Sequence, residues 1–304
     1  CSSDLYEGML LWPVRQLGRI LTDMGKMSVS LKRITKILDV PVEQEYGKAL
    51  KPEINGDISF ENVKFEYESG NEILRGITFK IKKGETVAIV GPTGSGKSSL
   101  VHLLLRLYDY NSGSIKVDGV ELKDIERKHM RSNVGIVLQE PFLYARTIKE
   151  NIKMAKMHSD DLEIYSAATA AAVHNVINSF EKGYDTIVGE KGVTLSGGQR
   201  QRVAIARTLI NDMPILIFDD SLSAVDTETD RVIRGKLKKK SENNTTFIIS
   251  HRISTVMAAD KIIVINHGKI ENIGTHEMLI KKDGIYKRIW EIQTSLDEDE
   301  VRNE

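Results

Sequence analysis

The chain has 304 residues, which is enough for one large domain or two small ones. Its 43 basic and 43 acidic residues balance, so no overall field draws it to nucleic acid or to an anionic membrane, and its hydrophobic content of 40% is ordinary for a globular protein. A single cysteine, Cys1, excludes an internal disulfide, and no uncharged apolar run approaches the ~20 residues of a membrane-spanning helix.

The first 55 residues differ from the rest of the chain. Between residues 14 and 39, apolar residues recur at helical spacing among basic and polar ones, which predicts an amphipathic helix. Such a helix either packs on the main domain or is the cytoplasmic end of a helix that descends from a membrane domain outside this chain. The stretch from Pro41 to Pro52 is rich in Glu, Lys and Gly, which is typical of a linker.

A compact α/β domain is expected over residues 56–295. Near-alternating apolar residues, with a one-residue slip at Asn62, predict an antiparallel layer of two strands with a bulge. A parallel sheet with crossover helices is predicted from five buried strands over residues 86–90, 134–138, 215–218, 247–249 and 262–265. Residues 140–195 contain no strand pattern and predict an inserted helical subdomain, whereas the acidic end, residues 296–304, is expected to fray.

A glycine-rich loop with the sequence GPTGSGKS follows the first of these parallel strands and precedes a helical pattern over residues 99–107. Strand, glycine loop and helix is the context of a phosphate-binding P-loop, because the glycines allow close backbone approach and the N–H groups point at an anion. Lys97 is expected to reach the β- and γ-phosphates of ATP, and the Ser98 hydroxyl to hold Mg²⁺. The predicted ATP-binding residues of this segment are Gly91, Pro92, Thr93, Gly94, Ser95, Gly96, Lys97, Ser98 and Ser99.

Two further motifs lie at the ends of predicted elements. The apolar strand over residues 215–218 is followed by Asp219, and a carboxylate at that end of a strand beside the P-loop is placed to meet Mg²⁺. A serine and two glycines precede a predicted helix over residues 200–210 and make a second anion site, which suggests that it serves the nucleotide of another subunit. The residues of this second motif are Leu195, Ser196, Gly197, Gly198 and Gln199.

Together with the P-loop, this pentapeptide resembles the signature of the ATP-binding cassette (ABC) family. The resemblance implies an α/β P-loop NTPase with a RecA-like parallel sheet core, an antiparallel β layer and an inserted helical subdomain. It also implies that Tyr67 stacks on adenine, that His251 contacts the γ-phosphate, and that Gln139 touches Mg²⁺ and senses the membrane domain. The loop that crosses between two cassettes in this family matches Ser223, Ala224, Val225 and Asp226.

Three segments narrow the resemblance to exporters. Residues 186–192 are similar to the loop that touches coupling helices, and residues 147–152 are similar to exporter cassettes. Residues 1–55 then resemble the cytoplasmic end of the last membrane helix and the linker of a half-transporter whose own membrane domain is missing from this chain. The implied partner is a second ABC half-transporter at the cytoplasmic face of the cell membrane, and a multidrug substrate is favoured by analogy alone.

One position departs from the family pattern. Cassettes that hydrolyse ATP efficiently carry glutamate after the Mg²⁺ aspartate, whereas this chain has Asp220 as the residue that polarises the attacking water. Aspartate is shorter by about one C–C bond, roughly 1.5 Å, and a misplacement of about 1 Å lowers a rate on the order of 100-fold. The site on this P-loop is therefore expected to bind ATP and to hydrolyse it slowly.

An intact signature beside a weak base resembles one half of the unequal pair in bacterial heterodimeric multidrug exporters. A homodimeric exporter cassette remains open at this stage. So does a nucleotide-gated binding module that binds ATP without hydrolysis, although a γ-phosphate contact by His251 argues mildly against it. An ABC ATPase acting on nucleic acid is disfavoured by the balanced charge.

Overall fold

The computed structural model describes residues 2–40, 43, 47–68, 70–189, 194–221, 229, 231–233, 235–236 and 244–303. The chain divides into two units, Cys1–Glu45 and Tyr46–Glu304.

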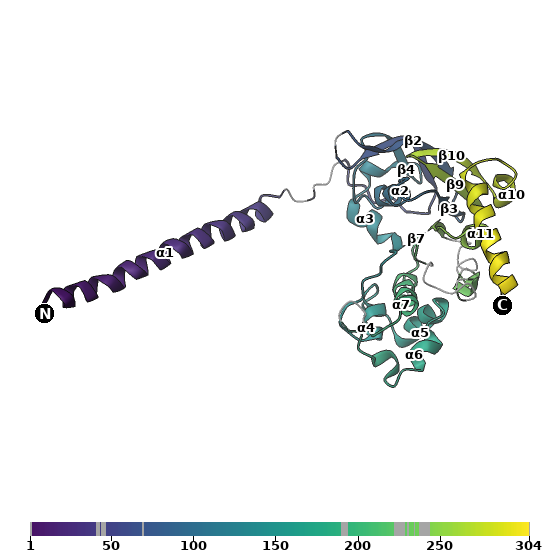
Figure 1. Cartoon of the computed structure of the whole chain (residues 1–304). Helices are drawn as coiled ribbons and strands as arrows, with labels where there is room; N and C mark the ends of the chain where they lie inside the picture. Colours follow the sequence, from purple (N-terminus) through teal and green to yellow (C-terminus); the bar gives the residue numbers. More distant parts are fainter. Residues whose placement is uncertain are drawn as a thin grey trace. The chain divides into compact units, whose positions relative to one another are not determined.

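The first unit holds one helix, α1 (Ser2–Leu38), coloured purple in Figure 1. The helix expected from residue 14 is present but begins at Ser2, and Pro13 lies inside it, because a missing hydrogen bond at one proline does not stop a helix that propagates on both sides. Its apolar side chains are exposed, among them Leu17 and Leu31. Among the described residues, no helix combines the length and the apolar character needed to cross a bilayer.

The second unit begins with an antiparallel sheet of strand order β2-β1-β4-β5 among the described residues. The predicted pairing of β1 (Ile58–Glu66) with β2 (Glu72–Ile81) is confirmed, and so is the bulge, because the register shifts between Phe60 and Val63 and Asn62 has a φ of 49°. The two other strands, β4 (Ser112–Val117) and β5 (Val120–Glu121), were not predicted. Both are short, and a tight turn joins them, so their apolar alternation is weak.

A second sheet has the order β10-β9-β3-β8-β7-β6 among the described residues. The prediction of a parallel core is confirmed, because neighbouring strands from β9 to β6 all pair in parallel. The strands are β3 (Thr86–Val90), β6 (Val134–Val137), β7 (Ile215–Asp219), β8 (Thr245–Ile249), β9 (Lys261–Asn266) and β10 (Lys269–Gly274). The unpredicted strand β10 pairs antiparallel with β9 and alternates between exposed and half-buried residues.

Short helices connect the strands. Two end differently from the prediction: α2 stops at Leu104 rather than at residue 107, since Arg106 has a left-handed φ of 52°, and α11 stays helical to Asn303, where fraying was expected. The helices around the two sheets are α2 (Lys97–Leu104), α3 (Arg127–Ser132), α9 (Ile253–Val256), α10 (His276–Leu279) and α11 (Ile285–Asn303), with a 3₁₀ turn at Leu122–Asp124. A second 3₁₀ turn, Gly183–Asp185, contacts α4 and α6.

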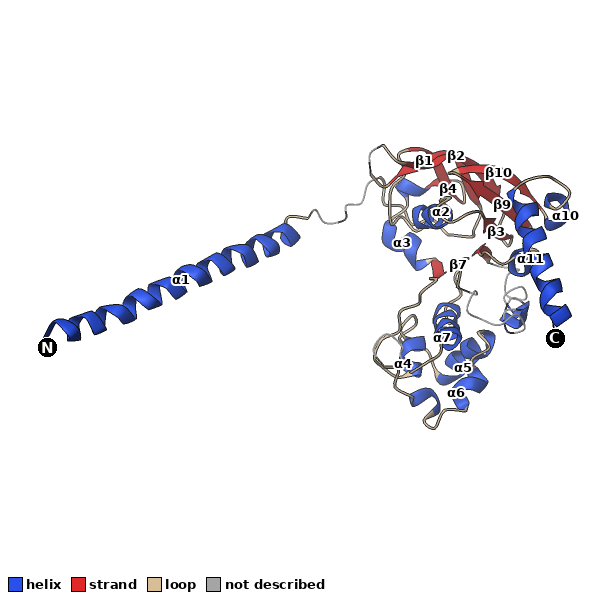
Figure 2. Ribbon diagram, in the orientation of Figure 1, coloured by secondary structure: helices blue, strands red, loops and turns tan. Residues whose placement is uncertain are grey.

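A separate group of helices is drawn apart from the strands in Figure 2. It contains α4 (Ile148–Lys153), α5 (Asp161–Ala170), α6 (His174–Asn178) and α7 (Gly197–Leu209). These helices share a core with fully buried Ile164, Ile177 and Ile205, and Phe218 of β7 joins that core from the sheet. The group is therefore packed on the strand that ends in Asp219, so the sheet and the helices together position that end of β7.

Candidate nucleotide-binding site

The P-loop is held in one shape by its surroundings. It runs from the end of β3 to the start of α2, as predicted, and its backbone turns at Gly96 with a φ of 102°. A side chain at Gly91 has no room, because a Cβ atom there would lie 2.0 Å from the carbonyl oxygen of Ile265. The loop thus presents bare backbone, which lets an anion approach its N–H groups.

The Lys97 side chain lies under the loop and is 7% exposed. Its Nζ donates hydrogen bonds of 2.9 Å to the carbonyl oxygens of Gly91 and Pro92. Burial lowers the pKa of Lys97, and the carboxylates of Asp219 and Asp220 oppose that shift. The ammonium group is therefore fixed beside the loop, where it could form a charge-assisted hydrogen bond with a phosphate.

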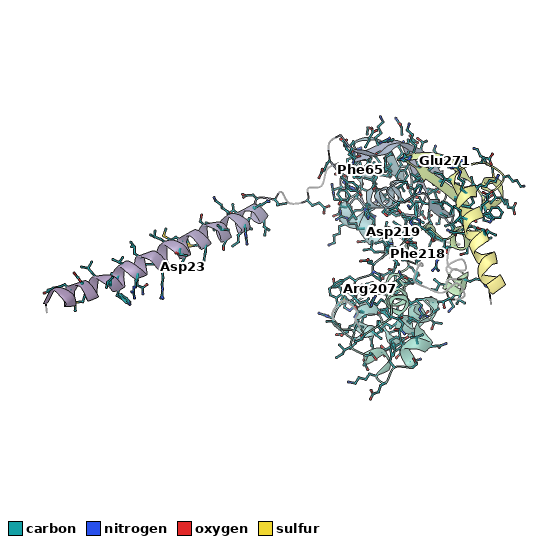
Figure 3. All side chains as sticks on the ribbon, viewed as in Figure 1. Asp23, Phe65, Arg207, Phe218, Asp219 and Glu271 are labelled. Atoms are coloured by element: carbon teal, nitrogen blue, oxygen red, sulfur yellow. The ribbon has the colours of Figure 1, made fainter. Side chains whose placement is uncertain are left out.

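Asp219 and Ser98 meet at the end of β7. The Ser98 hydroxyl donates to Asp219 Oδ1 over 3.3 Å, although the two residues lie on different elements (Figure 3 labels Asp219). Burial raises the pKa of Asp219, whose side chain is largely enclosed, while the hydrogen bond from Ser98 opposes the rise. A hydroxyl and one carboxylate are hard oxygen donors that fit Mg²⁺, which usually takes one or two carboxylates together with phosphate oxygens.

Asp220 and Gln139 are joined by their side chains, with Gln139 Nε2 donating to Asp220 Oδ2 over 3.3 Å. Asp220 has a left-handed φ of 44°, and its N–H donates to the carbonyl oxygen of Ile249 on β8. Left-handed backbone is tolerated best by Gly, Asn and Asp, so this conformation suits the residue that is present. The structure thus brings the residue expected to polarise water into direct contact with the glutamine expected to touch Mg²⁺ and to sense the membrane domain.

Tyr67 lies at the rim of the same site and is 46% exposed. Its hydroxyl is 3.0 Å from Ser99 Oγ, and its ring stands edge-on to Phe65 and Tyr108. Adenine stacking by Tyr67 stays a prediction.

One cavity of about 310 Å³ is lined by eleven of the fourteen residues predicted for ATP, Mg²⁺ or catalysis, and Gly91, Pro92 and Ser95 are not in its lining. The lining comes from the P-loop with the start of α2, from the carboxyl ends of β6, β7 and β8, and from Tyr67 after β1 and Ile73 in β2. The lining residues are Tyr67, Ile73, Thr93, Gly94, Gly96, Lys97, Ser98, Ser99, Gln139, Asp219, Asp220, Ile249 and His251. The carboxyl ends of parallel strands meet at one edge of a sheet, which explains why residues so distant in sequence line one space.

The signature motif lies outside that lining, although its residue Gly197 lines a neighbouring cavity together with Gln139. Ser196 caps α7: its hydroxyl accepts from the N–H of Gln199, and Gln199 Oε1 accepts from the N–H of Ser196. The reciprocal cap leaves the first N–H groups of α7 oriented as a helix N-terminus that could take an anion. Another part of α7 reaches the nucleotide site, since Gln201 Nε2 donates to the Gln139 carbonyl over 3.2 Å.

A second link between α7 and the segment after Gln139 was not predicted from the sequence. Arg207, labelled in Figure 3, donates to the carbonyl oxygens of Phe142 and Asn151 and to Asn151 Oδ1, over 2.8–2.9 Å. Asn151 is fully buried and also bonds both backbone groups of Tyr144. The sign of this contact in the sequence was an asparagine that stands between two apolar residues, Ile148 and Ile152.

Some predicted residues fall outside the described part of the chain. Ser223, Ala224, Val225 and Asp226, expected in the loop between cassettes, lie there, as do residues 190–192 of the expected coupling loop. The described part of that loop bonds to the helical group, because the N–H of Ile148 at the start of α4 donates to the carbonyl oxygen of Thr186.

A glycine loop around a buried lysine, with a carboxylate at the end of a neighbouring parallel strand, defines a P-loop nucleotide-binding domain. Residues 74–223 match the family described as ABC transporter. The chain is accordingly an ABC transporter nucleotide-binding domain. A solved structure to which it is similar is an ABC exporter.

The chain is 42% identical over 292 residues to the alpha-hemolysin translocation ATP-binding protein HlyB of Escherichia coli O157:H7, which covers 95% of the chain and 41% of that protein. It is 43% identical over 284 residues to the putative multidrug export ATP-binding/permease protein YgaD of Bacillus subtilis, covering 92% and 49%. A solved bacterial Atm1-family ABC exporter with ATP bound superimposes with a TM-score of 0.84 at 36% identity, covering 94% of this chain and 50% of that one. The chain thus spans less than half the length of these two curated relatives.

Proposed function

We propose that the chain is the ATP-binding and ATP-hydrolysing domain of an ABC exporter, in which nucleotide-driven closure of two such domains drives export across a membrane. The observation that supports this most directly is the single cavity lined by Lys97, Ser98, Asp219, Asp220 and His251. A lysine, a hydroxyl, two acidic groups and a histidine in one space are the groups that phosphoryl transfer to water requires.

In the proposed mechanism the P-loop N–H groups and Lys97 bind the β- and γ-phosphates. Ser98, Asp219 and Gln139 hold Mg²⁺, which neutralises charge on the phosphates when bound. Asp220 orients a water whose oxygen bonds to the γ-phosphorus as the bond to the β,γ-bridging oxygen breaks. The products are ADP and phosphate, the water's proton leaves to solvent, and His251 contacts the γ-phosphate.

The short side chain of Asp220 makes hydrolysis at this site slow. The carboxylate is already held by Gln139, and its backbone is fixed in the left-handed region by the bond to Ile249, so little adjustment remains to bring it forward. Ser196 and its cap on α7 keep the signature competent to serve the nucleotide of a partner. These features favour a heterodimer with a second ABC half-transporter at the cytoplasmic face of the cell membrane, with a homodimer as the alternative.

A second candidate is a nucleotide-gated binding module that does not turn over. The Gln139–Asp220 hydrogen bond favours it, since a carboxylate engaged by an amide is less available to a water.

The test measures ATP affinity and single-turnover hydrolysis for the chain and for Lys97→Met, with Lys269→Met, an exposed lysine on β10, as the matched control. We expect the P-loop variant to weaken ATP binding by about 100-fold and the control to leave it unchanged. Tight binding with no hydrolysis in any assembly would select the binding module. Equal affinity of both lysine variants and the wild type would refute a nucleotide site at the P-loop.

A further inference from the structure

The C-terminal helix α11 packs against the sheet core close to the nucleotide site. Its residues Ile285 and Ile289 are partly buried against a cluster that contains Ile253 and Val256 of α9, and the two helices are in contact. Positions four residues apart share one face of a helix, so Gln293 continues the same face one turn further on. That face brings Gln293 to the segment that joins β8 to α9.

The Gln293 side chain clamps that segment with both ends of its amide. Nε2 donates to the carbonyl oxygen of His251 over 2.6 Å, and Oε1 accepts from the N–H of Ile253 over 2.8 Å. The bond to Oε1 satisfies the first N–H of α9, a group that has no acceptor within its own helix. A single side chain that is 42 residues away from His251 therefore fixes the backbone on both sides of Arg252.

The clamped segment carries a side chain of the nucleotide cavity. His251 lines that cavity two residues after the end of β8, and α9, with four residues, is too short to set the path of the chain by itself. The carbonyl oxygen and the side chain of His251 share one Cα atom, so a bond to the carbonyl restrains the direction of the imidazole. Loss of the clamp would let the imidazole leave its place in the cavity while the sheet keeps its form.

We propose that Gln293 is a positioning residue that holds His251 toward the γ-phosphate, which makes α11 part of the nucleotide site. The inference rests on the proposed function, because it requires ATP in this cavity. Of the phosphates, His251 contacts only the γ-phosphate, which a diphosphate lacks. The clamp therefore affects nucleoside triphosphate binding and leaves diphosphate binding unchanged.

The experiment measures dissociation constants of AMP-PNP and ADP with Mg²⁺ for the whole chain and for Gln293→Ala, Gln293→Glu and His251→Ala. Gln293→Glu keeps the acceptor for Ile253 and places an acceptor against the His251 carbonyl, so it tests the clamp while the α9 contact stays. Ile292→Ala, whose side chain is 60% exposed on the same helix, is the matched control.

We expect both Gln293 variants to weaken AMP-PNP binding by about tenfold and to change ADP binding by less than about twofold, as for His251→Ala. The double variant His251→Ala/Gln293→Ala should be no weaker than His251→Ala alone, because the two residues act through one contact. Unchanged AMP-PNP binding, or equal weakening of both nucleotides, would refute the clamp and leave Gln293 a structural cap of α9. A wild-type chain that binds neither nucleotide would refute the proposed function, and the assignment with it.

Discussion

Gln139 Nε2 donates a hydrogen bond to Asp220 Oδ2 over 3.3 Å, which joins the end of β6 to the residue after β7. The Gln139 carbonyl accepts from Gln201 on α7, so this glutamine connects the helix that begins at the signature with the acidic pair of the nucleotide cavity. Movement of α7 therefore reaches Asp220 through one residue. A change in the length of the side chain at position 220 therefore tests directly how the position of this carboxylate affects ATP turnover.

Asp220→Glu should raise ATP turnover by about tenfold or more, because the longer side chain carries the carboxylate roughly 1.5 Å toward the attacking water. The same change should lower stability by about 1 kcal/mol, since the left-handed φ of 44° favours aspartate over glutamate. Phosphate release and urea unfolding measure the two effects.

Asp220→Asn is the control for that change. Asparagine suits the left-handed backbone and has the same size as aspartate, but it lacks the negative charge. Turnover should therefore fall further, while stability should stay within about 0.5 kcal/mol of the wild type. Turnover that Asp220→Glu leaves unchanged or lowers would show that side-chain length at this position does not limit the reaction.

Asn151→Ala should destabilise the chain by about 3 kcal/mol. The buried amide bonds both backbone groups of Tyr144, the carbonyl of Thr147 and the guanidinium of Arg207, and its removal leaves these groups without partners in the interior. Arg207→Met should cost less, about 2 kcal/mol, because Asn151 keeps its bonds to Tyr144. Urea unfolding measures both.

Asn175→Ala, an exposed asparagine on α6, is the matched control for Asn151→Ala and should change stability by less than about 0.5 kcal/mol. The double variant Asn151→Ala/Arg207→Met should lose less than the sum of the single losses, because both residues belong to one network. Full additivity would show that the two side chains act independently on the segment after Gln139.

Much of the nucleotide site follows from the order of motifs along the chain. Lys97 follows β3 after the P-loop, Asp219 ends β7 and His251 lies two residues after β8, and a parallel sheet brings the carboxyl ends of such strands to one edge. The strand pattern was enough to predict that edge. The hydrogen bonds that tune it were not predictable in this way, because Gln293 reaches His251 from 42 residues away and no local periodicity records that distance.

Weak local patterns account for the elements that were missed. In β10, Ile270 and Ile273 lie on an edge strand that is half-exposed, so its apolar alternation is incomplete. In β4, the strand begins beside Gly113, whose φ of 93° turns the backbone close to Asn62, a tertiary contact that the sequence does not reveal. By contrast, the bulge at Asn62 was visible as a slip in the alternation of β1.

Alkaline pH should destabilise the chain through two buried tyrosines. Burial raises the pKa of Tyr184 to about 12, with Tyr165 adding to the shift, and burial raises the pKa of Tyr286 to about 12. Their hydroxyls contact His174 Nδ1 and His276 Nδ1. Because each folded pKa lies above the model-peptide value near 10, this stability is fully present below about pH 10 and is lost as the pH rises toward about 12.

Tyr184→Phe and Tyr286→Phe should each remove part of that loss, about 1–2 kcal/mol between about pH 9 and about pH 12, as measured by urea unfolding at each pH. Tyr6→Phe is the control, since Tyr6 is 68% exposed on α1 and should leave the alkaline profile unchanged. Burial also raises the pKa of Tyr110, so an absorbance titration of the phenols should show, in each variant, one group fewer than in the wild type that ionises above the model-peptide value near 10. If both variants keep the full alkaline loss of stability, the tyrosines do not cause it, and the drop must come from other groups that titrate in the same range, such as lysines.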